Sequence, residues 1–308
     1  MSDLSNPIFH NETKAREWLE ARLWPDGPIC PKCGVIDQAT LMQGGSHRPG
    51  LYQCNACREP FTVTVNTLYE RSKIPLHKWL AATHLMMASK KGMSALQVGR
   101  MLGLSKKTAW FLCHRIRESL RETYPDMLGG DGMTVEIDES FVGGLEKNKH
   151  RKKRQHLGTG GSGKEAVVAL VERGGRVHSH HVPEVNAKTL GTILNAQLHG
   201  ASYVYTDEGG AMKKAGSKFE RHDSINHSIG EYVRGDVHTN TIEGYFSIMK
   251  RGIHGVYHHV SQQHLKRYLA EFDYRYNERV ALGVDDAERM AKSIPGIVGK
   301  RLYYKTPS

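Results

Sequence analysis

The chain has 308 residues, of which 39% are hydrophobic and 24% are charged, so it can form the cores of two or three domains. No stretch is long and apolar enough to span a bilayer, and the N-terminus lacks a basic segment followed by an apolar run; we therefore expect an intracellular protein without a membrane partner. The formal net charge of +11 favours nucleic acid as the partner, with a merely soluble basic protein as the alternative.

Four of the five cysteines form two Cys-x-x-Cys pairs near the N-terminus. Cys30 and Cys33 lie in "CPKCG", Cys54 and Cys57 lie in "YQCNACREPF", and twenty residues separate the pairs. This spacing predicts one structural zinc site with four thiolate ligands, which leaves no open position for catalysis. Two disulfides are the alternative, and an intracellular setting disfavours them. The alternation in "LYQCNACREPFTVTVNTLY" predicts β structure after the second pair, as in a zinc ribbon.

A basic helical region follows the cysteines. The stretch "MSALQVGRMLGLSKKTAWFLCHRIRESL" predicts a helix, a tight turn and a second helix, with Gly103 ending the first helix and Ser105 capping the second. Lys106, Lys107 and Thr108 then begin the second helix, where a recognition helix contacts base edges and phosphates. We interpret the two helices as a DNA-binding helix-turn-helix. The alternative is a plain helical hairpin with a solvated basic face.

The second half of the chain changes to short apolar runs of the β type. The segments "MTVEIDESFVGG", "KEAVVALVERGG" and "RVHSHHVP" predict three strands, and "SYVYTDEGGAM" predicts a fourth. Between the last two, "NAKTLGTILNAQLHG" predicts a helix that Asn186 caps and Gly200 ends, and "HTNTIEGYFSIMKRG" predicts a later helix. We expect the histidines of "HSHHVP" on the surface, and the basic run "KNKHRKKRQHLGTGGSGK" in a loop that can contact DNA phosphates. This order predicts one mixed sheet with helices packed against it.

Two aspartates end predicted strands, since Asp138 follows "VEI" and Asp207 follows "YVYT". Neighbouring strand ends can bring both carboxylates together, and a helix crossing that edge of the sheet can add Glu243. Clustered carboxylates repel unless cations lie among them, and oxygen ligands suit Mg²⁺ or Mn²⁺. Two such ions can activate a water or a 3′-hydroxyl and stabilise the leaving oxygen of a phosphodiester. Lys250, seven residues after Glu243, shares its helical face and would reach a DNA phosphate, next to Arg251.

Each acidic residue also has a structural explanation. The aspartates could cap strand ends, and Glu243 could form a surface ion pair; the combination behind a zinc ribbon and a basic helical module favours catalysis. Asn240 lies three residues before Glu243 on the same helical face and stays open as the third ligand. His238 could position DNA or simply begin the helix. Weaker candidates, each beside a motif position, are Glu139, Glu208 and Asp236.

The chain resembles the bacterial insertion-sequence transposases of the ISXO2-like family, which combine an N-terminal zinc ribbon with a DDE catalytic domain of RNase H-like (retroviral-integrase) fold. The resemblance covers nearly the whole chain and rests on "WPDGPICPKCG", "YQCNACREPFTVTVNTLYERSKIPLHKWL", "VEIDESFVGG", "YTDEGG", "HTNTIEGYFSIMKRGIHGVYHHVS" and "LKRYLAEFDYRYNER". It implies a catalytic triad of Asp138, Asp207 and Glu243, with 35 residues between the last two and with Lys250 as the basic residue seven positions later. Related enzymes can carry Asn or His in place of the third acid.

These observations together predict a multidomain α/β protein. The predicted domains are a zinc ribbon with a short N-terminal helix (1–70), a helix-turn-helix region (71–128), an RNase H-like catalytic domain (129–290) and a C-terminal tail (291–308).

The resemblance implies a DNA transposase that contains structural Zn²⁺ and catalytic Mg²⁺ or Mn²⁺. Its partners would be double-stranded DNA, as terminal inverted repeats and as target, and further copies of the chain in a dimer or higher multimer. It would work in the bacterial cytoplasm at the nucleoid. A DNA-binding transcription regulator without catalysis is the main alternative, and a metal-dependent nuclease without strand transfer is the second.

Overall fold

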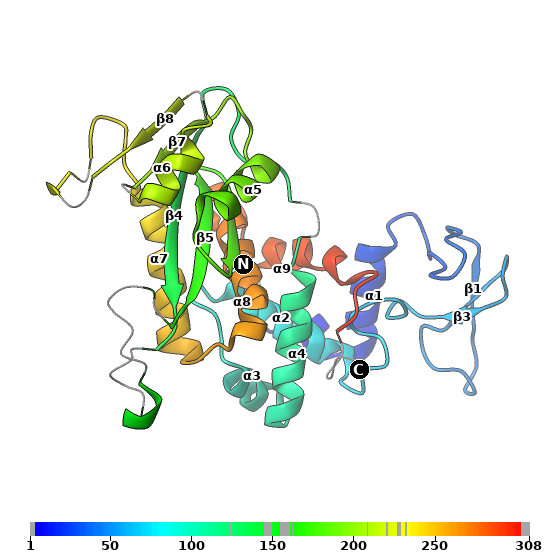
Figure 1. The fold of residues 1–308 in the computed structure, drawn as a ribbon. Helices are drawn as coiled ribbons and strands as arrows, with labels where there is room; N and C mark the ends of the chain where they lie inside the picture. Colours follow the sequence, from blue (N-terminus) through cyan, green and yellow to red (C-terminus); the bar gives the residue numbers. More distant parts are fainter. Residues whose placement is uncertain are drawn as a thin grey trace. The chain divides into compact units, whose positions relative to one another are not determined.

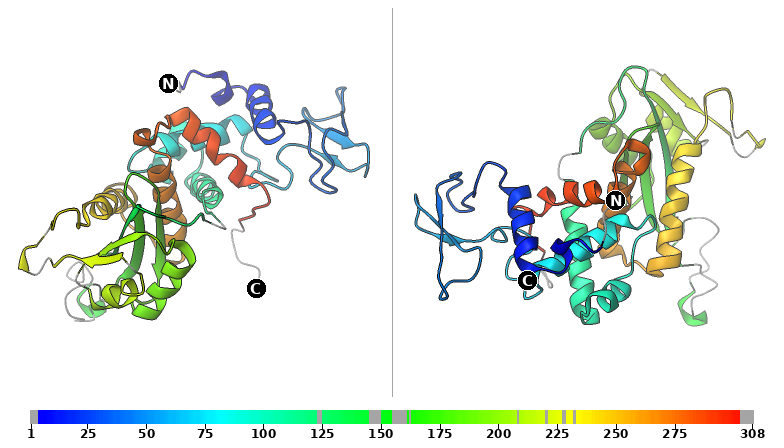
Figure 2. Two further views of the ribbon diagram at one scale, coloured as in Figure 1. Left: turned by 90° about the horizontal axis from the view of Figure 1, so that it is seen from above. Right: turned by 180° about the vertical axis from the view of Figure 1, so that it is seen from behind.

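The computed structural model describes residues 4–122, 125–144, 150–154, 161, 163–207, 209–219, 221–226, 229–231 and 233–302. The chain forms two compact units (Figure 1, Figure 2). Met1–Arg121 and Gly283–Ser308 make one, the ribbon–helix unit, and Glu122–Leu282 make the other, the sheet unit. Most of the predicted basic loop, and Glu208, lie outside the described residues. Among the helices that are described, none combines the length and the apolar composition that crossing a membrane requires.

The ribbon–helix unit begins with a short helix and a small antiparallel sheet. Its elements are the 3-10 helix η1 (Pro7–Phe9), α1 (Glu12–Leu23), β1 (Ala39–Leu41), β2 (Tyr52–Cys54) and β3 (Pro60–Phe61). The strand order is β1-β2-β3. Trp24 packs edge-on against Tyr52 and Phe61, at ring-centroid distances of 5.5 and 5.7 Å. This aromatic group closes a core that is too small to be stable by apolar burial alone, which is where a metal site contributes most.

The predicted β alternation after the second cysteine pair is wrong beyond Phe61. Residues 63–66 and 68–70 form turns instead, and Thr67 between them makes an isolated bridge to Val298. The Thr67 hydroxyl donates to the Thr64 carbonyl at 2.7 Å, and Asn66 has a positive φ of 58°. Threonine and asparagine side chains that bond to the local backbone compete with strand pairing, so this polar alternation specifies turns.

Three helices form the predicted helix-turn-helix region: α2 (Leu76–Ala88), α3 (Ala95–Leu102) and α4 (Lys106–Ser119). Gly103 ends α3 in the left-handed conformation, with φ of 63°, which glycine adopts without a steric penalty. The Ser105 side chain accepts from the Thr108 N–H at 3.2 Å and caps α4. The predicted helix, turn and helix are therefore confirmed, with both punctuating residues in their predicted roles.

The C-terminal segment belongs to the ribbon–helix unit. It contains α9 (Asp286–Ser293) and the 3-10 helix η7 (Pro295–Ile297). Arg289 is buried and donates to the Met87 carbonyl at 3.1 Å, and Lys300 donates to the Ser119 carbonyl at the end of α4 at 3.1 Å. The compact units therefore divide the chain after Arg121 and after Leu282. The domains predicted from the sequence end at residues 128 and 290 instead. The difference at the second boundary arises because α9 packs on α2.

The sheet unit contains one five-stranded mixed sheet. Its strands are β4 (Thr134–Val142), β5 (Glu165–Glu172), β6 (Val177–Val182), β7 (Tyr203–Thr206) and β8 (Arg221–Ser224). The order is β6-β5-β4-β7-β8, with β4 antiparallel to β5 and parallel to β7. The helices are α5 (Ala187–Gln197), α6 (Gly210–Gly216), α7 (Asn240–Gly252) and α8 (Gln262–Asn277), with shorter turns η3 (Arg151–Lys153), π-helical η5 (Ile253–Tyr257) and η6 (Val280–Leu282). The predicted mixed sheet flanked by helices is confirmed.

Two elements of this unit were not predicted, α6 and β8. The segment "RHDS" of β8 carries no apolar alternation, so only its parallel pairing with β7 makes it a strand. Asn186 caps α5 as predicted, because its side chain accepts from the Thr189 N–H at 2.9 Å. The predicted C-terminal end is wrong, since the helix ends at Gln197 rather than at Gly200.

Helices cover both faces of the sheet, which explains the continuous apolar run in β5. Val168 and Leu170 face the cluster that includes α5 and α6, while Val167 and Val171 face the cluster of α7 and α8. In β4, Val135 and Ile137 join the α5 cluster. Because side chains alternate along a strand, Glu136 and Asp138 point to the α7 face. The alternation in β4 therefore places acidic side chains beneath α7.

The surface position expected for the histidines of β6 is wrong for His178, which is 5% exposed. Burial lowers the pKa of His178 to about 4, and the nearby charge of Arg176 acts in the same direction. The unfolded chain binds a proton near pH 6.5, whereas the folded chain does so only near pH 4. The free energy of unfolding should therefore fall as the pH drops from about 6.5 to about 4.

We expect His178→Phe to remove this contribution. As the pH falls through that window, the variant should gain stability relative to wild type, by up to about 1.4 kcal/mol in free energy of unfolding per pH unit. Urea unfolding followed by hydrogen exchange of the β5 and β6 amides would measure it. A difference that does not change with pH would show that His178 titrates normally in the folded chain.

Candidate functional site

The four paired cysteines gather around one point in the ribbon–helix unit. Their sulfur atoms all lie within 4.8 Å of one another, and the Cys30–Cys57 and Cys33–Cys54 distances are both 3.6 Å. Thiolates around a tetrahedral zinc would lie about 3.8 Å apart, whereas a disulfide needs about 2.05 Å. The N–H of Cys57 donates to Cys54 Sγ at 3.5 Å and, with that of Ala56, lowers the pKa of Cys54, whereas burial and the neighbouring thiols raise the pKa of Cys57. The residues therefore fit a structural zinc site.

The two predicted aspartates meet in the sheet unit. The prediction that Asp138 ends its strand is wrong, because β4 continues along β5 as far as Val142; Asp207 does follow the last residue of β7. Strands β4 and β7 are parallel neighbours with Ile137 opposite Thr206, so the next residues, Asp138 and Asp207, are neighbours too. Carboxylate oxygens of Asp138, Glu139 and Asp207 lie within 4.8 Å of one another. The structure thus brings together the two predicted aspartates and adds Glu139, which the sequence ranks only as a weaker candidate.

The carboxylates of this cluster are partly buried and repel one another. Burial raises the pKa of Asp138 to about 8, and the charge of Asp207 adds to the shift, followed by Glu139 and Glu243. Burial also raises the pKa of Glu139, again with repulsion from Asp207. Two backbone N–H groups hold the aspartates in place: Glu139 donates to Asp138 Oδ1 at 2.7 Å, and Gly209 donates to Asp207 Oδ1 at 2.9 Å. A divalent cation among these oxygens would relieve the repulsion, so the donor set fits Mg²⁺ or Mn²⁺.

Helix α7 carries the candidates for the third ligand. Glu243 is exposed in the first turn of α7, and its Oε1 accepts from the Thr239 hydroxyl at 3.3 Å. Its charge contributes to the raised pKa of Asp138, so it lies within electrostatic reach of the pair. It is absent from the group of carboxylates within 4.8 Å. Asn240 is exposed one turn earlier, so both candidates lie on the open side of the helix.

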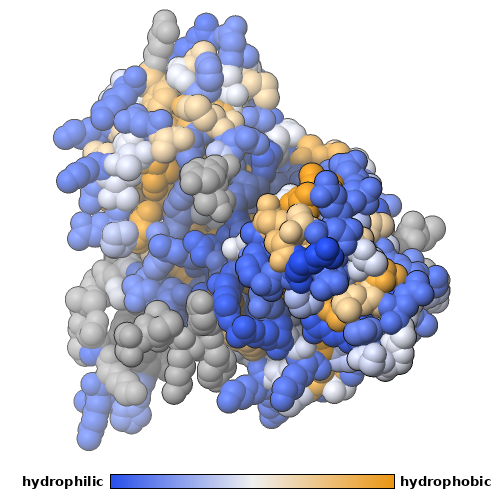
Figure 3. Space-filling view, turned by 90° about the vertical axis from the view of Figure 1, so that its right-hand side faces the viewer, coloured by the Kyte–Doolittle hydropathy of each residue, from blue (hydrophilic) through white to orange (hydrophobic). Residues whose placement is uncertain are grey.

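The predicted DNA-contacting residues occupy two helices, one in each unit. Lys250 and Arg251 are exposed in the last turn of α7. Lys106 and Lys107 are exposed at the start of α4, whereas Thr108 is half-buried. The described side chains on the face drawn in Figure 3 are mainly hydrophilic, with apolar residues in small separate groups, as the excess of Lys and Arg leads one to expect.

The Thr108 hydroxyl lies 2.8 Å from the Ser105 hydroxyl, and its N–H donates to the same oxygen. Thr108 therefore contributes to the helix cap, and its availability for a base contact stays a prediction.

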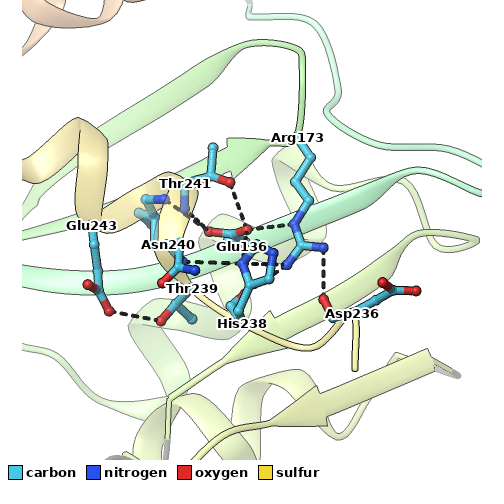
Figure 4. A network of polar contacts seen from close by, with 9 residues as sticks. Glu136, Arg173, Asp236, His238, Thr239, Asn240, Thr241 and Glu243 are labelled. Atoms are coloured by element: carbon cyan, nitrogen blue, oxygen red, sulfur yellow. Dashed lines mark hydrogen bonds and ion pairs between the residues drawn. The ribbon is translucent and has the colours of Figure 1, made fainter. Parts of the chain in front are cut away.

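A buried polar network that was not predicted from the sequence lies beside this site. Glu136 lies in β4 two residues before Asp138 and is 0% exposed. It pairs with Arg173 at 2.6 Å and accepts from N–H groups of α7 (Figure 4). One signal was available: "VEI" puts a glutamate in the middle of a strand that is otherwise apolar, and a buried carboxylate requires partners.

Comparisons with known proteins find matches to the segment that contains the cysteine cluster and to the segment that contains the carboxylate cluster. Residues 127–277 match the ISXO2-like transposase domain, and residues 10–59 match the transposase zinc-ribbon domain. The chain belongs to the ISXO2-like insertion-sequence transposases. This transposase is also 29% identical over 281 residues to a Halobacterium salinarum protein named "Uncharacterized protein in transposable element ISH50". The match covers 87% of this chain and 91% of that protein.

The matched segments of this ISXO2-like transposase contain both candidate sites. The cysteine cluster lies within 10–59, and Asp138, Asp207, Glu243 and Lys250 lie within 127–277. Helices α3 and α4 lie between the two matched segments. Membership therefore supports an enzyme of the DDE class that acts on DNA, while the DNA contacts of α4 rest on helix geometry and charge.

Proposed function

We propose that this transposase binds the terminal inverted repeats of its element, cleaves a phosphodiester there, and joins the freed 3′-hydroxyl to target DNA. The observation that carries the proposal is the convergence of Asp138 in β4 and Asp207, directly after the parallel strand β7, with a third acidic side chain within 4.8 Å. The cluster lies inside the segment that matches the transposase domain, which supports a role in cutting and joining DNA strands.

Asp138, Asp207 and Glu243 would hold the divalent ions, Mg²⁺ or Mn²⁺, and Glu139 is a further candidate ligand. When bound, a pair of such ions supplies activation of the attacking oxygen and stabilisation of the leaving oxygen. The chain's contribution is to keep the carboxylates converged. The backbone bonds to Asp138 and Asp207 fix their orientation, and the parallel pairing of β4 with β7 fixes their separation.

The basic residues would orient the DNA. Lys250 and Arg251, two turns along α7 from Glu243, would contact phosphates of the strand at the site. Lys106, Lys107 and Thr108 would place α4 in the major groove of the terminal repeats, with the zinc-filled ribbon beside them in sequence. Joining two ends of one element to a target requires a dimer or higher multimer.

The first test is a strand-joining assay with pre-cut DNA from the ends of the element and Mg²⁺. We expect Glu243→Gln to lower the joining rate by about a thousandfold, because the amide keeps the size of the side chain but loses the charge that binds the cation. Asn240→Ala should stay within about tenfold of wild type. The opposite pattern, with joining lost only in Asn240→Ala, would assign the third ligand to the amide.

A further inference from the structure

Glu136 is fully removed from water in the middle of the sheet unit. It lies on β4, and the alternation of the strand puts its side chain on the same face as that of Asp138. Burying a carboxylate is costly unless both oxygens are paired. The partners of Glu136 therefore indicate what the residue does.

Both oxygens of Glu136 bind the first turn of α7. Oε2 accepts from the N–H groups of Thr241 at 2.8 Å and Ile242 at 3.0 Å, and Oε1 accepts from the Thr241 hydroxyl at 2.9 Å. The residue before the helix, Thr239, makes no capping bond with its own side chain. Glu136 thus caps α7 from another element, at the helix end where a negative charge is stabilised (Figure 4).

Arg173 completes the network from the turn after β5. Its Nε donates to Glu136 Oε1, Nη1 donates to the Asp236 carbonyl at 2.9 Å, and Nη2 donates to the His238 carbonyl at 2.9 Å. Its guanidinium also lies over the Tyr205 ring, 5.0 Å from the centroid. Arg173 therefore joins Glu136 to the segment that leads into α7.

His238 has a helix-start role in this network. Its Nδ1 lies 2.9 Å from Arg173 Nη2 and 3.4 Å from the Asn240 N–H. Both neighbours are donors, so they direct their hydrogens at Nδ1. Arg173 supplies the permanent positive charge beside Glu136.

We propose that Glu136, held by Arg173, is a positioning residue that fixes the first turn of α7 on β4 and thereby sets where Glu243 lies relative to Asp138. The bonds act on the backbone N–H groups immediately before Glu243, so any shift in them moves Glu243 directly. Metal ligands must be held within about 0.5 Å of their working geometry, and groups that orient ligands typically contribute 10–100-fold to metal affinity. The inference rests on the proposed function, because it assumes that the carboxylates bind a cation.

Glu136→Gln tests the inference on the full chain without DNA, with Mn²⁺ as the probe. The NH2 of the Gln side chain would have to face either Arg173 or the N–H groups of α7. All of these groups are donors, so one set of hydrogen bonds would be lost. We expect the Kd for Mn²⁺, measured by the electron paramagnetic resonance signal of free Mn²⁺, to rise about 10–100-fold. Hydrogen exchange of the Thr241 and Ile242 amides should speed up at the same time.

Glu271→Gln is the matched control. Glu271 is also 0% exposed and paired with an arginine, Arg275, and it accepts from the Tyr257 hydroxyl at 2.7 Å. It lies in α8, and the partners Arg275 and Tyr257 lie in α8 and η5. We expect this variant to be destabilised as well, but to keep the wild-type Kd for Mn²⁺.

Equal increases of the Kd in the two variants would reduce Glu136 to a stabilising residue and overturn the inference, as would an unchanged Kd in Glu136→Gln. If Glu136→Gln does not fold, Arg173→Lys replaces it, because it keeps the charge beside Glu136 but loses the fork that holds the carbonyls of Asp236 and His238; the Kd should then rise several-fold. Failure of the proposed function would differ: wild type and Asp138→Asn would both bind no Mn²⁺, which would overturn both claims.

Discussion

Asp138→Asn is expected to lower strand cleavage and joining at least about a thousandfold while DNA-end binding stays within about twofold of wild type. Burial raises the pKa of Asp138, and the charges of Asp207, Glu139 and Glu243 raise it further. Losing the charge of Asp138 would remove a proposed cation ligand without removing any residue of α4 that is proposed to contact the DNA. Gel-based cleavage and joining assays, with fluorescence anisotropy for end binding, would measure the two effects separately.

The control for this variant is Asp131→Asn, which changes an acid of the same unit that is 88% exposed and lies 3.5 Å from Arg221. It should behave as wild type in both assays, because exposed ion pairs contribute little. Retained cleavage in Asp138→Asn would make the cluster structural. A wild-type chain that binds the ends but neither cuts nor joins with any divalent metal would instead favour the DNA-binding regulator.

Zinc removal is expected to abolish specific end binding, by at least about a hundredfold, and to unfold the small sheet of the ribbon–helix unit. Structural zinc contributes on the order of 10 kcal/mol to folding in comparable small motifs. The aromatic core around Phe61 is too small to compensate. Cys54→Ser should have the same effect, since Cys54 is a buried member of the proposed zinc site and accepts from the N–H of Cys57.

Zinc content by colorimetric release and end binding by anisotropy at fixed salt would measure this effect. Cys113→Ala is the matched control, because Cys113 is buried in α4, outside the cluster; it should keep a full complement of zinc. The four clustered cysteines all lie in the ribbon–helix unit, so hydrogen exchange in β4 and β5 of the sheet unit should not change on zinc removal. Unaltered folding and end binding in a fully zinc-free chain would contradict the assignment.

Local signals were sufficient wherever the chemistry depends on spacing along the chain. The two Cys-x-x-Cys pairs each form one turn, so their sulfurs converge as predicted. Gly103 and Ser105 end and begin helices through their own backbone and side-chain bonds. Asp138 and Asp207 each follow an apolar run, and these runs become adjacent parallel strands in register. Asp207 directly follows β7, whereas Asp138 lies inside the longer strand β4, so the register and not a shared strand end makes them neighbours.

Features that depend on distant partners could not be predicted in this way. Glu136 is 37 residues from Arg173 and 105 residues from Thr241, so nothing local shows that its charge caps α7. The strand β8 exists because β7 pairs with it, and the C-terminal segment joins the ribbon–helix unit because Arg289 reaches Met87. The residue types that can bind metal and DNA are thus evident from sequence spacing, whereas their relative positions depend on buried polar bonds between segments far apart in the chain.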